Sequence, residues 1–124
     1  MPKKILVVDD EKDLVEVLLK RLRAHGYEAV SAADGEEALR IIKKERLDLI
    51  ILDIMMPVMD GTELAEILRD DPKTKNIPLI FVTALGVKQE DDGYSLAGAH
   101  AVFAKPFDSK ELLGKIDELL GGRS

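Results

Sequence analysis

The stretch LIILDIMMPVMDG (residues 49–61) joins a run of aliphatic residues to an aspartate, Asp53, and then to a proline and an Asp-Gly pair. A short and continuously apolar run of this kind is typical of a β-strand that is covered on both faces. Pro57, Asp60 and Gly61 are residue types that favour a sharp turn after such a strand. The stretch therefore predicts a buried strand that ends in a carboxylate and leads into a turn.

Four further strands are predicted on either side of this one. Short apolar runs recur along the chain and alternate with longer segments in which apolar residues return every three or four positions. Strands that alternate with helices build parallel sheets with right-handed crossovers, so we expect a (βα)5 doubly wound α/β fold, a three-layer sandwich around a five-stranded parallel sheet. The expected strand order is 2-1-3-4-5, as in flavodoxin-like folds. The predicted strands are KILVVD (4–9), YEAVSA (27–32), DLIILD (48–53), PLIFVT (78–83) and HAVFA (100–104).

Helix signals fill the segments between the strands. The first segment carries an apolar stripe, followed by Gly26 where a C-terminal cap would end the helix. Two later segments open with the acidic pairs of N-terminal caps. A short third helix is predicted over residues 62–69. Residues 87–99 are a poor helix candidate, since a glycine inside a helix costs about 1 kcal/mol relative to alanine, and we expect this segment to be short or mobile. The stripe is Leu14, Val17, Leu18 and Leu22, and the cap pairs are Asp34 with Glu37 and Asp108 with Glu111.

Length and composition limit the class of protein. The chain has 124 residues, enough for one domain with its own core, and a formal net charge of -6 that disfavours direct contact with nucleic acid or anionic membranes. It contains no cysteine, which excludes disulfides and thiolate zinc sites, and no run that suits a signal peptide or membrane insertion. We expect a cytoplasmic protein with one domain over residues 1–120. Residues 121–124 are expected to be a flexible tail, a linker or a remnant of expression.

Polar residues are predicted to gather at the carboxyl edge of the sheet. Asp9 and Asp10 close the first strand, Asp53 the third and Thr83 the fourth, and Lys105 follows the fifth. Three carboxylates in one crevice repel one another unless a cation neutralises them, and oxygen ligands without His or Cys favour Mg²⁺. We expect Asp10 and Asp53 to be direct ligands. Taken singly, each acid of the first strand is more simply a helix cap and Lys105 a solvated lysine, so the prediction depends on their convergence.

The motifs at these strand ends resemble those of response regulator receiver domains, the CheY-like domains of two-component signal transduction. The resemblance covers essentially the whole chain. It implies that Asp53 accepts a phosphoryl group from a histidine kinase or a phosphotransfer protein, in a reaction that needs Mg²⁺ or, as a substitute, Mn²⁺. It also implies that phosphorylation changes the affinity for an output protein or domain, which the sequence does not identify. The motifs are VVDD (7–10), LDIMMPVMDG (52–61), VTA (82–84) and KPF (105–107).

The resemblance also assigns roles to single residues. Asp9, Asp10, Asp53 and the backbone carbonyl of Met55 are expected to hold the metal, directly or through water, while Thr83 and Lys105 bind the phosphoryl oxygens. These residue types suit the chemistry, because Asp53 supplies an anionic oxygen for in-line attack and the cations offset charge on the transferring group. The implied protein is not an enzyme for other substrates but a signalling domain that catalyses its own phosphorylation and dephosphorylation. We expect the Asp53 carboxylate to be exposed at the mouth of the crevice.

Two other classes of protein share parts of this pattern. A Mg²⁺-dependent phosphohydrolase of the haloacid dehalogenase type also uses an aspartyl nucleophile, but it carries a second aspartate two residues later, where this chain has Met55. A flavodoxin-like carrier of flavin or nucleotide needs a phosphate-binding loop rich in Gly, Ser or Thr, where this chain has the acidic VVDDEKD (7–13). Within the family, a stand-alone shuttle and a receiver excised from a larger regulator both remain open.

The chain departs from the family pattern at one position. Receiver domains commonly carry Tyr or Phe three residues before the lysine, and this chain has Val102 there. The neighbouring Phe103 is expected to face the opposite side of the sheet. We therefore predict weak aromatic coupling to the output face, with residues 87–99 carrying more of the switch. Met55 and Leu85 flank the crevice, and neither side chain can orient a water molecule. We therefore predict slow hydrolysis of the aspartyl phosphate.

Overall fold

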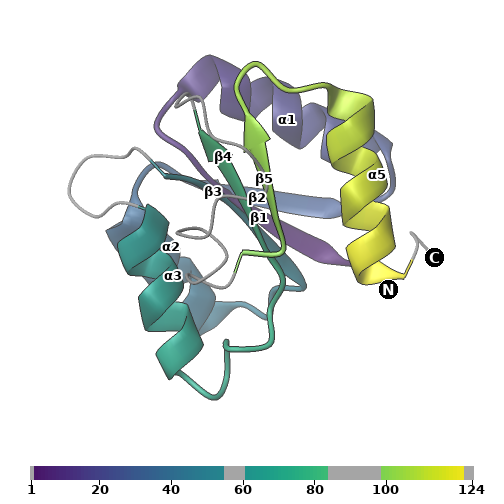
Figure 1. Cartoon of the computed structure of the whole chain (residues 1–124). Coiled ribbons are helices and arrows are strands. Elements are labelled where there is room, and N and C mark those ends of the chain that lie inside the picture. Colours follow the sequence, from purple (N-terminus) through teal and green to yellow (C-terminus); the bar gives the residue numbers. More distant parts are fainter. Residues whose placement is uncertain (1, 55–60, 84–98, 122–124) are drawn as a thin grey trace.

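One parallel five-stranded sheet organises the computed structural model, which describes residues 2–54, 61–83 and 99–121 (Figure 1). The strand order is β2-β1-β3-β4-β5, as predicted, and the described strands and helices alternate as expected from β1 to β4 and from β5 to α5. Each strand is one residue shorter than its prediction. The elements are β1 (Lys4–Val8), α1 (Lys12–Ala24), β2 (Glu28–Ala32), α2 (Gly35–Lys44), β3 (Leu49–Asp53), α3 (Gly61–Asp70), β4 (Leu79–Thr83), β5 (Ala101–Ala104) and α5 (Ser109–Leu120).

The sheet separates two apolar layers, because successive side chains of a strand point to opposite faces. On one face, the even-numbered residues of β1 pack with α2 and α3, and on the other the odd-numbered residues pack with α1 and α5. Figure 1 shows these two helix pairs on opposite sides of the sheet. The strands β3 and β4 are buried along their whole length. The predicted three-layer sandwich is therefore confirmed.

The register of the strands decides which residues meet at the carboxyl edge. Val8 of β1 pairs with Leu52 of β3, so the residues that follow Val8 lie beside the end of β3. Asp53 pairs with Val82, and Thr83 pairs with Ala104, the last residue of β5. The sheet thus brings the ends of β1, β3, β4 and β5 to a common edge, although the four strands come from distant parts of the chain.

The helix ends follow the predicted capping pattern. Asp34 accepts the backbone N–H of Glu37 at 2.9 Å, and the Glu37 carboxylate accepts the N–H of Ala33 at 2.8 Å. Asp108 accepts two N–H groups of the first turn of α5, at 2.7 and 3.4 Å. Gly26 follows α1 with a φ of 96°, a backbone conformation that residues with a Cβ rarely adopt. These three local signals confirm the predicted ends of the helices.

The predicted apolar stripe of α1 was wrong at one residue. Val17 is 49% exposed, whereas Val15, Leu18 and Leu22 are buried. With 3.6 residues per turn, these three residues share one side of the helix, and Val17 lies well away from that side. Val17 instead lines a groove between α1 and the start of α5.

Two further points concern longer segments of the chain. The weak helix expected over residues 87–99 lies, apart from Ala99, outside the residues that the structure describes. Within the described residues, every helix is too short or too polar to cross a membrane.

A polar cluster fixes the far end of α5 against α1. The Nε2 atom of His25, which caps α1, lies 3.0 Å from Oδ2 of Asp117 in α5. The hydroxyl of Tyr27, which is buried just before β2, donates to the other oxygen of the same carboxylate. One aspartate of α5 therefore contacts two residues of the α1–β2 connection.

We expect Gly61→Ala to destabilise the fold by about 1–3 kcal/mol, because a Cβ at this position would lie 2.6 Å from the Asp53 carbonyl oxygen. The matched control is Gly114→Ala in the exposed part of α5, where a Cβ would meet nothing within 4 Å. That change should stabilise the protein by about 0.5–1 kcal/mol. Urea unfolding of both variants measures the difference, and two changes of the same sign would contradict the prediction.

His100, just before β5, makes stability depend on pH. Its Nδ1 accepts the N–H of Leu79 at 3.3 Å, which requires an unprotonated nitrogen. Partial burial of the ring lowers the pKa of His100 below its ordinary value of 6.5, and the positive charges of Arg69 and Lys115 lower it further. The unfolded chain therefore binds a proton at His100 at a higher pH than the folded protein does.

The free energy of unfolding should consequently fall as the pH drops below 6.5 toward the lower folded pKa of His100. Urea unfolding at a series of pH values between 7.5 and 5 measures this dependence. In the His100→Asn variant the decrease should be smaller than in the wild type. Equal pH dependence in the two proteins would show that His100 is not its source.

Candidate functional site

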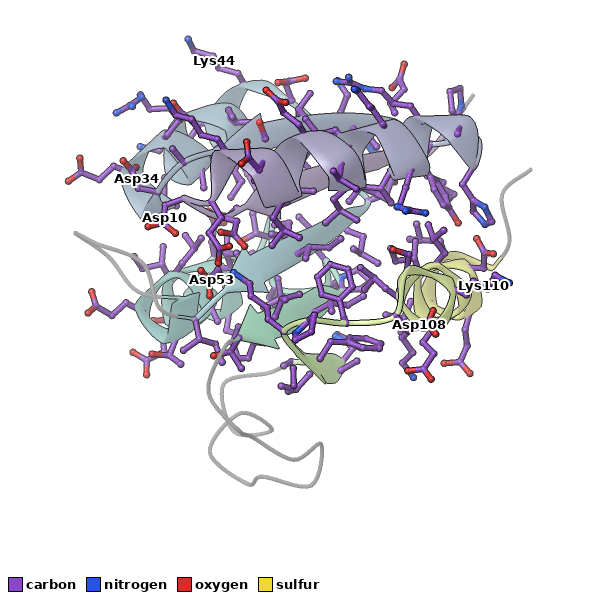
Figure 2. All side chains as sticks on the ribbon, turned by 90° about the horizontal axis from the view of Figure 1, so that it is seen from above. Asp10, Asp34, Lys44, Asp53, Asp108 and Lys110 are labelled. Atoms are coloured by element: carbon purple, nitrogen blue, oxygen red, sulfur yellow. The ribbon has the colours of Figure 1, made fainter. Side chains whose placement is uncertain are left out.

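Three carboxylates meet at the carboxyl edge of the sheet. One carboxylate oxygen from each of Asp9, Asp10 and Asp53 lies within 4.8 Å of the other two. Asp9 and Asp10 directly follow β1, and Asp53 is the last residue of β3, so the pairing of these two strands explains the proximity. Figure 2 shows Asp10 and Asp53 close together at this edge, away from Lys110 at the start of α5. The predicted acidic cluster is thus present.

The carboxylate of Asp53 is less accessible than the sequence suggested. Asp53 is 4% exposed and Asp9 is 7% exposed, whereas Asp10 is open to solvent. The expectation that Asp53 would be exposed at the mouth of the crevice is therefore wrong. The reason is crowding at the sheet edge, where Lys105 Nζ lies 3.4 Å from Asp53 Oδ2 and a carboxylate oxygen of Asp9 lies within 4.8 Å of one of Asp53.

Lys105 supplies the positive charge of the cluster. Its Nζ lies 2.9 Å from Asp9 Oδ2 and 3.4 Å from Asp53 Oδ2, and its side chain is only 11% exposed. Burial by itself would lower the pKa of Lys105, but hydrogen bonds to Glu11 and Asp9, together with the charges of Asp9 and Asp53, outweigh burial and raise the pKa above 10.5. The ammonium therefore remains charged throughout the neutral pH range.

Thr83 ends β4 next to this cluster. Its side chain is fully buried, and its backbone carbonyl accepts the N–H of Lys105 at 2.8 Å. The backbone bond links the residue after β5 to the end of β4. The predicted contribution of the Met55 carbonyl lies outside the described residues, as does Leu85. Of the six predicted site residues, the structure thus places five at one edge of the sheet.

The residue that departs from the family pattern, Val102, is buried and packs in the α2–α3 layer. Its partner across the sheet is Phe81 of β4, which is fully buried in the same layer. Phe103 packs in the opposite layer, as predicted. A large ring therefore lies in β4, beside a small residue in β5.

Sequence reasoning missed Glu11. Its Oε1 lies 2.6 Å from Lys105 Nζ, closer than either aspartate that the lysine contacts. The signal in the sequence was weak, because an acid just before a helix is ordinarily explained by the helix dipole. Its partner follows 94 residues later, and only the fold reveals the contact.

The donor set fits a hard divalent cation. All three converging groups are carboxylates, and Asp10 is not among the ion-pair partners of Lys105. Carboxylate oxygens are the ligands that Mg²⁺ and Mn²⁺ prefer in proteins, and an exposed Asp10 leaves the site open to ion and water. Asp9, Asp10 and Asp53 are the described residues that could hold such an ion.

Comparisons with known proteins agree with this geometry. The sequence matches the response regulator receiver domain over residues 5–117. It is 49% identical to the "Probable transcriptional regulator ycf27" of Cyanophora paradoxa, over 95% of this chain and 48% of that protein. It is 32% identical to the polar-differentiation response regulator DivK of Brucella anthropi, over 98% of both chains. The structure resembles the Mg²⁺–BeF complex of response regulator TrrA from Thermotoga maritima, with 41% identity, 95% and 99% coverage and a TM-score of 0.84.

Replacing Lys105 with Gln should destabilise the metal-free protein by about 1–3 kcal/mol, because the buried carboxylates of Asp9 and Asp53 lose their counter-charge. The control is Lys115→Gln, which removes an ion pair with the exposed Glu118 and should cost no more than about 0.5 kcal/mol. Urea unfolding in the presence of a chelator compares the two variants. If Lys105→Gln loses no more free energy of unfolding than Lys115→Gln does, the prediction is contradicted.

Proposed function

The chain belongs to the response regulator receiver domain family, and we propose that Asp53 is its phosphoacceptor. Receiver domains of this family are phosphorylation-activated signalling domains. The observation that carries the assignment is the cluster at the carboxyl edge, where a buried carboxylate at the end of β3 meets two further acids and one lysine. The donor of the phosphoryl group is a histidine kinase or a phosphotransfer protein.

The reaction is an in-line displacement at phosphorus. An oxygen of Asp53 forms a bond to the phosphorus atom as the bond from phosphorus to the histidine nitrogen of the donor breaks, and that nitrogen keeps the electron pair. The buried position of Asp53 strips water from the nucleophile and fixes its direction. Positioning and electrostatics supply most of the catalysis.

Neighbouring residues stabilise the charge of the transferring group. Asp9, Asp10 and Asp53 would hold Mg²⁺ or Mn²⁺, and the ion would supply charge neutralisation on the phosphoryl oxygens. Lys105 Nζ lies 3.4 Å from Asp53 Oδ2 and can move its ammonium onto a phosphoryl oxygen. Thr83 can donate its hydroxyl to another. Because these groups belong to the receiver itself, the domain catalyses both its own phosphorylation and the hydrolysis that reverses it.

Phosphorylation then acts as a switch. The aspartyl phosphate carries more charge and more acceptor oxygens than a carboxylate, so Lys105 and Thr83 gain partners that differ from those they have at rest. Movement of Thr83 and Lys105 alters the ends of β4 and β5 and the loops that follow. The proposed consequence is a changed affinity for an output protein or domain.

Residues 1–120 are proposed to form one receiver domain, with residues 121–124 as a tail or linker. The chain spans about half the length of the first curated relatives that it matches, and nearly the whole of DivK. Both a domain of a larger regulator and a stand-alone receiver are consistent with these relatives. A net charge of -6 supports an output through a partner or another domain rather than direct contact with nucleic acid.

Intact-mass spectrometry after incubation with acetyl phosphate and Mg²⁺ tests the assignment of Asp53. The wild type should gain the mass of one phosphoryl group, Asp53→Asn should gain none, and omission of Mg²⁺ should reduce the gain strongly. Mn²⁺ should restore it. Modification of Asp53→Asn to the same extent as the wild type would show that another residue is the acceptor. Multiple turnover of small phosphomonoesters would instead indicate a phosphohydrolase.

A further inference from the structure

Glu11 occupies the N-cap position of α1, but its side chain does not cap the helix. The backbone of Glu11 has the extended conformation of an N-cap residue, with φ of -84° and ψ of 97°, yet its carboxylate accepts no N–H from the first turn. The side chains that commonly accept such a hydrogen bond are those of Ser, Thr, Asp and Asn, so the longer Glu11 side chain is free of a capping role. The carboxylate of Glu11 lies against Lys105 instead.

The three partners of Lys105 are not equally close. Nζ lies 2.6 Å from Glu11, 2.9 Å from Asp9 and 3.4 Å from Asp53. Charge-assisted hydrogen bonds of an ammonium have lengths of about 2.7–2.9 Å, so the two contacts near α1 are strong and the contact with Asp53 is at the limit. The ammonium is therefore drawn toward α1 and away from the nucleophile.

We propose that Glu11 is a positioning residue that holds Lys105 away from Asp53 at rest and competes with the phosphoryl group for its ammonium. The inference rests on the proposed function of Asp53. On phosphorylation, Lys105 exchanges the Glu11 carboxylate for a phosphoryl oxygen, while the buried Asp9 remains its second partner. An ammonium has three hydrogen-bond donors, and Glu11, Asp9 and Asp53 already match that number.

The exposure of Glu11 explains why the exchange is feasible. Its side chain is 58% exposed, whereas those of Asp9 and Asp53 are 6% and 5% exposed. Water can hydrate the released Glu11 carboxylate. Breaking the ion pair of Lys105 with Glu11 therefore costs far less free energy than breaking its ion pair with the buried Asp9 or Asp53. Glu11 is thus the partner of Lys105 that is easiest to replace.

Two possible roles of Glu11 predict opposite effects on the binding of a phosphoryl analogue. If Glu11 oriented Lys105 for phosphoryl binding, removal of its charge would weaken the binding of a phosphoryl analogue. If Glu11 competes for Lys105, removal of its charge strengthens the binding of the phosphoryl analogue. Since exposed ion pairs are weak, we expect Glu11→Gln to bind a phosphoryl analogue about two- to fivefold more tightly than the wild type does.

Isothermal titration calorimetry with Mg²⁺ and beryllofluoride, the type of complex found in the TrrA structure, measures this affinity. The matched control is Glu16→Gln, which removes the same charge from the exposed surface of α1. Glu16 lines the same acidic surface as Asp9 and Asp10 but is not among the ion-pair partners of Lys105. A second background, Lys105→Ala, tests whether Glu11 acts through the lysine.

Three results are expected together. Glu11→Gln binds beryllofluoride more tightly than the wild type, Glu16→Gln gains less, and Glu11→Gln brings no gain in the Lys105→Ala background. Without metal, ¹⁵N NMR of the Lys105 ammonium should show a changed resonance in Glu11→Gln and an unchanged one in Glu16→Gln. This second measurement reports the ion pair independently of phosphoryl chemistry.

Several results would overturn the proposal. Equal or weaker binding by Glu11→Gln would exclude competition, and an equal gain in the control or in the Lys105→Ala background would assign the effect to net charge. A failure of the proposed function is distinguishable from these outcomes. In that case the wild type itself would not bind beryllofluoride, or Asp53→Asn would bind it equally well.

Discussion

The ion pairs of one buried ammonium hold this end of the molecule together. Lys105 lies between Asp9, which follows β1, and Asp53, which ends β3, and its side chain is almost as inaccessible as those of these two aspartates. Buried carboxylates are costly without a counter-charge, so the ends of β1, β3 and β5 must stay close enough for one lysine to serve them. The same closeness creates the chemical site. Structural stability and reactivity therefore depend on the same set of contacts.

The sheet provides that closeness through register and steric fit. The in-register pairing of β1 with β3 places Asp9 and Asp10 beside Asp53, and β4 carries Thr83 to the same edge. Gly61 contributes in a different way, since its N–H bonds to the Ile54 carbonyl and only a hydrogen fits where a Cβ would meet the backbone of Asp53. The start of α3 can thus lie directly against the end of β3. Aliphatic packing on both faces makes this arrangement rigid.

Local signals allowed most of the fold to be predicted from the sequence. Continuous apolar runs identified the strands, acidic caps and Gly26 identified helix ends, and the common edge of a parallel sheet identified Asp9, Asp10, Asp53, Thr83 and Lys105. Finer details depend on tertiary contacts that no local pattern contains. Val15 rather than Val17 faces the core, since the orientation of α1 is set by its packing on the sheet. The burial of Asp53 and the contact of Glu11 with Lys105 likewise arise from side chains that are distant in sequence.

Because Phe81 in β4 is paired with Val102 in β5, this position limits how a structural change at Thr83 can be passed from the site to β5. Phe81 is two residues before Thr83 on the same face of β4, and it is fully buried in the α2–α3 layer. Val102, its partner in β5, has no ring that could turn. The described link between these two strand ends is a main-chain bond, in which the Thr83 carbonyl accepts the N–H of Lys105. The ends of β4 and β5 are therefore coupled through their main chains, and Val102 offers no aromatic ring whose rotation could couple them.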